Sequence, residues 1–117
     1  MAKRDITGAV DFGYLETYSG NDFGLVEEVL GLFRQQASMW GPMLNPTEPG
    51  WRDAVHTIKG TARGIGAAHL ANECERAETS GPGALPAVQQ ALDEALMDVA
   101  AYLHELALQS LKPSSRP

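Results

Sequence analysis

Apolar residues recur every three or four positions along most of this chain, which is the period of a helix that buries one face. The pattern predicts a short helix over residues 12–19 and longer ones over 23–40, 49–66, 67–79 and 86–111. We expect an all-α fold, an antiparallel four-helix bundle with the additional short N-terminal helix covering one end. An irregular orthogonal bundle is the alternative, and the long apolar seam of the last helix favours the aligned bundle.

Polar side chains mark where the first helices begin. Asp11 can cap the short helix and Asn21 or Asp22 the next, because a short polar side chain accepts hydrogen bonds from free backbone N–H groups. The chain reads as a single domain over residues 1–117. We expect residues 1–10 to form a loose arm and residues 112–117 a disordered tail.

Three prolines and two glycines fall within residues 41–50 and predict a loop. Thr47 or Glu48 should cap the helix that follows, with Pro49 in its first turn.

The charge of -6 and the pI near 4.9 argue against a nucleic-acid partner, because phosphate backbones attract clustered Lys and Arg side chains. No apolar run is long enough to span a membrane, and the N-terminus lacks the apolar region of a secretory signal. A single cysteine excludes an intrachain disulfide framework. These features favour a cytoplasmic protein.

The helix after the loop carries a basic stripe as well as an apolar one. Arg52, His56, Lys59 and Arg63 recur at helical spacing, roughly 120° round from the apolar seam. Gly60 lies one turn beyond His56, although glycine within a helix costs about 1 kcal/mol relative to alanine. We therefore expect something to approach the backbone closely there.

His56 is the candidate with a mechanism. Neutral imidazole is a good nucleophile near pH 7, since its reference pKa is about 6.5. Attack on a phosphoryl group gives a phosphoramidate, whose charge nearby cations would hold without reacting. On spacing alone, a solvated helix face without chemistry is the more common explanation of such a stripe.

A larger set of residues sharpens this interpretation. The run HTIKG, residues 56–60, is followed by Gly66, and Cys74 is followed four positions later by Glu78. With these spacings the chain resembles the histidine phosphotransfer (HPt) domains of bacterial two-component phosphorelays over residues 11–111. In several members of that family the polar residue 22 positions after the histidine reaches the imidazole from the neighbouring helix, and Glu78 stands there.

The resemblance implies a role for each residue of the motif. His56 would accept a phosphoryl group from the phospho-aspartate of a receiver domain and pass it to another. Lys59 and Arg63 would screen the phosphohistidine, and Arg52 would flank it. Glu78 would orient the imidazole by accepting a hydrogen bond from its other nitrogen.

The resemblance also implies the partners, which are response-regulator receiver domains and a hybrid histidine kinase. The receiver would supply Mg²⁺, so this chain needs no cofactor or metal of its own, and we expect a monomer. The sequence contains no Gly-rich nucleotide loop, so we expect a phosphotransfer intermediate that is not a kinase. A helical interaction module without phosphotransfer, or the His-bearing domain of a larger chemotaxis-type kinase, are the alternatives.

Two positions depart from the family pattern. Arg63 stands where a small residue is usual, and Gly64 where a polar residue is common. We expect a loosened helix end there, with Arg63 as an added phosphate or partner contact.

The remaining histidines and the cysteine are better explained by structure than by chemistry. His69 and His104 are expected at the surface, and Cys74 falls on a core stripe. His69, Glu73 and Cys74 lack a recognised metal-ligand spacing, so we expect no metal site.

Overall fold

The computed structural model describes residues 8–111, and no strand occurs among them. Residues 1–7 of the expected arm, and the whole of the expected tail, lie outside the described residues. The elements, in chain order, are α1 (Phe12–Tyr18), α2 (Phe23–Trp40), the 3-10 turn η1 (Gly41–Met43), α3 (Trp51–Ile65), α4 (Ala68–Ser80), the 3-10 turn η2 (Pro82–Ala84) and α5 (Leu85–Leu111).

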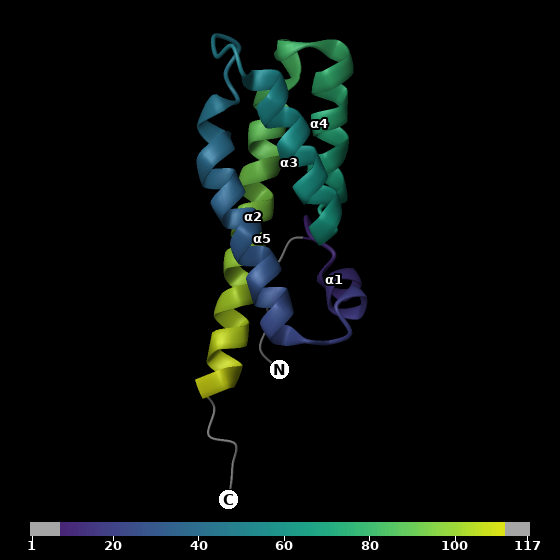
Figure 1. Cartoon of the computed structure of the whole chain (residues 1–117), viewed down its shortest axis with the longest axis vertical. Coiled ribbons are helices and arrows are strands. Elements are labelled where there is room, and N and C mark those ends of the chain that lie inside the picture. Colours follow the sequence, from purple (N-terminus) through teal and green to yellow (C-terminus); the bar gives the residue numbers. More distant parts are fainter. Residues whose placement is uncertain (1–7, 112–117) are drawn as a thin grey trace, which may run out of the picture.

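The four long helices alternate in direction, so the predicted antiparallel bundle is confirmed (Figure 1). Helix α3 packs between α2 and α4, and α5 closes the ring by contacting α4 and α2. The short α1 lies beside the end of the α3–α4 hairpin and contacts α2 and α3 (Figure 1). As expected, it covers one end of the bundle. No helix within residues 8–111 combines the length and the apolar character that a membrane crossing requires.

One continuous apolar core lies inside this ring, and each helix contributes a stripe to it. On α3 the buried residues are Trp51, Ala54, Val55, Ile58, Ala62 and Ile65. On α4 they are Leu70, Ala71, Cys74 and Ala77, the residues that the helical period predicts. Burial of such side chains supplies about 1.5–3 kcal/mol for each large one, so these stripes hold α3 and α4 rigidly together.

The buried face of α5 follows the predicted apolar seam only in part. Leu96, Leu103 and Leu106 are only partly buried, while Tyr102 is fully buried and stacks on Phe12 with ring centroids 4.2 Å apart. At 1.5 Å per residue, α5 is about 40 Å long and α3 only about 22 Å. Residues of α5 beyond the reach of the shorter α3 and α4 therefore lack these two helices as neighbours, and the buried stripe narrows there.

Local capping explains why α1 and α2 begin where the sequence predicts. Asp11 accepts a hydrogen bond from the backbone N–H of Tyr14 at 3.0 Å, and Asp22 accepts one from Leu25 at 3.1 Å.

Helix α3 ends at Gly66, whose φ of 81° places it in the left-handed region that glycine tolerates. Helix α3 continues through Gly64, so the expected loosened end is not observed.

The predicted start of α3 is wrong by about two residues. The helix begins at Trp51 with Gly50 as its N-cap, and no side chain caps it. The hydroxyl of Thr47 donates instead to Asn45 Oδ1 at 2.9 Å. Because this local turn engages the Thr47 hydroxyl, Thr47 does not cap α3.

Residues 8–10 do not belong to a loose arm. The carboxylate of Asp98, buried on α5, accepts hydrogen bonds from the backbone N–H groups of Gly8 at 3.2 Å and Ala9 at 2.9 Å. Val10 is buried in the core. Residues 8–10 therefore pack onto the bundle ahead of α1.

Candidate functional site

His56 stands on a buried and well-packed part of α3. Ala54, Val55 and Ile58 are at most 1% exposed, whereas the His56 side chain is 75% exposed. The imidazole is thus presented to solvent from a rigid base, as the helical pattern predicts.

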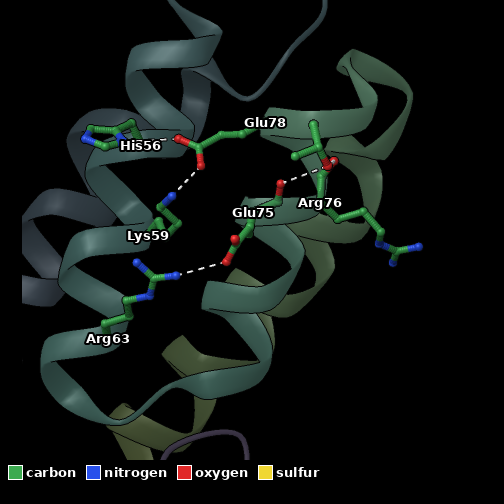
Figure 2. A network of polar contacts seen from close by, with 7 residues as sticks. His56, Lys59, Arg63, Glu75, Arg76 and Glu78 are labelled. Carbon is green, nitrogen blue, oxygen red and sulfur yellow. Dashed lines mark hydrogen bonds and ion pairs between the residues drawn. The ribbon is translucent and has the colours of Figure 1, made fainter.

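Glu78, on α4, joins His56 to Lys59 (Figure 2). Its Oε2 lies 3.1 Å from His56 Nδ1, and its Oε1 accepts a hydrogen bond from the Lys59 ammonium. The Lys59 side chain is only 15% exposed, so this ion pair is partly withdrawn from water. The contact expected between Glu78 and the imidazole is therefore present.

The charge state of Glu78 determines which ring nitrogen of His56 carries the proton. Hydrogen bonding from the Lys59 ammonium, and to a smaller extent from His56, holds the pKa of Glu78 below its ordinary value, although partial burial acts in the opposite direction. An ionised carboxylate can only accept hydrogen bonds. Nδ1 of a neutral His56 must then be the donor, which leaves the lone pair on Nε2.

Two of the three bases expected to screen or flank the phosphohistidine contact other residues. Arg63 pairs with Glu75 of α4 at 2.9 Å, and both side chains are 57% exposed (Figure 2). The guanidinium of Arg52 lies over the Trp51 ring, 4.4 Å from its centroid. Of the three bases, only Lys59 enters the hydrogen-bond network of His56.

The physical reason is that α4 places two acids opposite the basic stripe. Glu75 and Glu78 lie three residues apart, so they share one face of α4 and each meets a base on α3. Sequence reasoning missed Glu75 as a partner of Arg63. Its spacing from Glu78 is the signal that could have revealed it.

The other flank of His56 is bare. By helical geometry Gly60 lies about 40° and Gly64 about 80° round α3 from His56, while Lys59 lies about 60° in the opposite sense. Both glycines are exposed, and a Cβ on either would meet no atom within 4 Å. Packing within the chain therefore does not require glycine at these positions.

The other candidate residues have structural roles. Burial raises the pKa of the Cys74 thiol to about 12, as expected for a small core residue. His69 and His104 are exposed, as predicted. Within the described part of the chain, no group of three or more His, Cys, Asp or Glu side chains is arranged to hold a metal ion.

Comparisons with known proteins bear on this arrangement. The sequence model of the family described as "Hpt domain" matches residues 46–109, which include His56 and Glu78. The fold is similar to the crystal structure of histidine phosphotransferase ShpA from Caulobacter crescentus, with a TM-score of 0.83 and 58% sequence identity over 90% of this chain and 100% of that one. A comparison with curated proteins found no match.

Proposed function

This chain belongs to the Hpt domain family and is a phosphorelay histidine carrier, and on that basis we propose that His56 is the residue that carries the phosphoryl group. It accepts the group from the phospho-aspartate of one receiver domain and passes it to another. One observation carries the proposal: Glu78 holds Nδ1 of His56 while most of the imidazole faces solvent.

In the proposed transfer, the lone pair on Nε2 attacks phosphorus. A nitrogen–phosphorus bond forms as the bond from phosphorus to the aspartyl oxygen breaks, and the aspartate carboxylate leaves with the electron pair. The proton stays on Nδ1, so the ring gains positive charge, which the Glu78 carboxylate stabilises through its hydrogen bond. Transfer to the next receiver is the same step in reverse.

Lys59 is the base that we propose for stabilising the phosphoryl charge. Glu78 holds its ammonium beside the imidazole, where it can turn toward the phosphoryl oxygens. Arg63 and Arg52 contact Glu75 and Trp51 instead, and we propose that they contribute to partner docking.

We propose receiver domains as the partners, one of them within a hybrid histidine kinase. The receiver brings Mg²⁺ with its own aspartate pocket. Gly60 lets the backbone of that partner approach α3, because no side chain covers the helix there.

The test is incubation of the protein with a phosphorylated receiver domain, followed by measurement of an acid-labile, base-stable label. We expect the wild type and His104→Gln to take up label and His56→Gln to remain unlabelled. His104 is a matched control because it is an exposed histidine on another helix. If no receiver from the same cell labels the wild type, the protein is an interaction module with the fold alone.

A further inference from the structure

Arg63 lies on the same line of α3 as His56. The two residues are seven positions apart, which places Arg63 about 20° round the helix from His56 and about 10 Å along its axis. A specific interface covers about 800 Å² on each partner, which is a patch that extends about 16 Å from its centre. A protein centred on the imidazole of His56 therefore covers Arg63 as well, and the Arg63 side chain is 57% exposed.

The Arg63 guanidinium has hydrogen-bonding capacity that the chain does not use. Its Nη2 donates to Glu75 Oε1 at 2.9 Å, and this is the one hydrogen bond of the guanidinium to a residue within 8–111. A guanidinium carries five N–H donors in a planar fork, and two of them can bind one carboxylate together. Glu75 is as exposed as Arg63, so the pair contributes little to stability and leaves most of the donors open to a partner.

A pocket of about 250 Å³ opens beside Arg63, between α1 and the turn that joins α3 to α4. Its walls are mostly apolar, and Tyr14, Gly66 and Ala68 contribute to them together with Asp11 and Arg63. The backbone N–H of Asp11 donates to the Gly66 carbonyl at 2.9 Å, which fixes α1 against the end of α3. Tyr14 is 45% exposed, so its ring forms an accessible side of the pocket.

The hydrogen bonds around this pocket indicate which chemical group it accepts. The Asp11 carboxylate already receives a hydrogen bond from the Tyr14 backbone N–H, and Glu75 already receives one from Arg63. The remaining N–H groups of Arg63 are unused donors, so the matching group on a partner is an acceptor with negative charge. A glutamate side chain combines such a carboxylate with an apolar stem that suits the walls.

We propose that this pocket is a specificity site, in which a glutamate of the docked receiver domain packs its stem on Tyr14 and binds its carboxylate to Arg63. The proposal rests on the proposed function, because exchange with His56 is what brings the receiver to this surface. A receiver that presents a lysine or arginine at the same place faces Arg63 with like charge and is disfavoured. The pocket thus selects among receivers at a distance from the reacting nitrogen.

The first test compares Arg63→Gln with Arg76→Gln in phosphotransfer from each phosphorylated receiver of the same cell. Arg76 is the matched control because it is 59% exposed and also pairs with a glutamate, yet it extends away from α3 (Figure 2). Because Arg63 lies away from the reacting atoms, we expect Arg63→Gln to raise KM for the preferred receiver about tenfold and to leave kcat unchanged. It should also narrow the difference in kcat/KM between preferred and other receivers. Equal KM values and equal preferences in the two variants would overturn the proposal.

The second test fills the pocket. Ala68 is exposed at the start of α4, and leucine there occupies the space that the glutamate stem requires. Ala100→Leu is the control, because Ala100 is an exposed helical alanine on α5 and is not part of this pocket. We expect Ala68→Leu to raise KM about tenfold while Ala100→Leu behaves as the wild type. An unchanged KM in Ala68→Leu would show that no partner side chain enters the pocket.

If Arg63→Gln or Ala68→Leu fails to fold, the side-chain N–H signals of Arg63 and Arg76 in the wild type are followed by NMR during titration with the receiver. Movement at Arg63 but not at Arg76 supports the proposal, and no movement at Arg63 overturns it.

The two proposals fail differently. Wild-type protein that takes up no label from any receiver refutes the role of His56. Labelled wild type with an unaltered Arg63→Gln variant refutes only the specificity site.

Discussion

Substitution of Gly60 tests whether this glycine lowers the stability of α3 while it leaves the helix surface beside His56 uncovered. Replacing it with glutamine adds a side chain where a Cβ meets no atom within 4 Å, in a backbone conformation that other residues adopt. Glycine within a helix costs about 0.5–1 kcal/mol relative to a good helix former. We expect Gly60→Gln to raise the free energy of unfolding by about that amount, and Tm by about 2–4 °C for a domain of this size.

The same substitution should weaken partner binding, because the new side chain occupies the open path beside His56. We expect Kd for the receiver to rise at least about tenfold, or 1.4 kcal/mol. Thermal unfolding by circular dichroism measures the first effect, and isothermal titration calorimetry with the receiver measures the second.

Gly31 of α2 provides the matched control. It is also an exposed helical glycine with open space around its Cβ position, and it lies on a different helix from His56. Gly31→Gln should gain similar stability and bind the receiver as the wild type does. Destabilisation by Gly60→Gln would refute the helix argument, and unchanged receiver affinity would refute the docking argument.

Three further predictions concern Lys59, Glu78 and Cys74. Lys59→Ala should shorten the lifetime of the phosphorylated protein, followed as loss of label; an unchanged lifetime would remove Lys59 from its proposed role. Folding lowers the pKa of the Glu78 carboxyl, so the ionised carboxylate stabilises the folded protein at pH values above its ordinary pKa of 4.5. This stabilisation is lost as the pH falls through the lower pKa of the folded state. Urea unfolding should therefore show a difference in the free energy of unfolding between wild type and Glu78→Gln that shrinks below about pH 4.5. A difference that stays constant with pH would contradict this reasoning. The Cys74 thiol, with its pKa raised to about 12, should resist alkylation in the native protein at pH 8 and react on unfolding, whereas rapid native labelling would contradict its burial.

Features that depend on neighbouring residues were predictable from the sequence. The starts of α1 and α2 follow from Asp11 and Asp22, whose side chains bond to backbone a few residues away. The exposed face of α3 follows from its helical period, and so does the position of His56.

Features that depend on the register between helices were not predictable. The residue spacing predicts the basic stripe on α3. The pairing of its Lys59 and Arg63 with acids depends on how α4 packs against α3. The attachment of residues 8–10 likewise depends on Asp98, about ninety residues away along the chain.

The unlike surroundings of the two imidazole nitrogens have a kinetic consequence for the proposed relay. Because Glu78 occupies Nδ1, only Nε2 can react. Every donor and every acceptor of the phosphoryl group must therefore bind the same surface to reach this one nitrogen. Two receivers cannot then engage the protein together, so each must depart before the next arrives. Flux through such a carrier follows ping-pong kinetics, in which an abundant acceptor competes with the donor for the same free molecules.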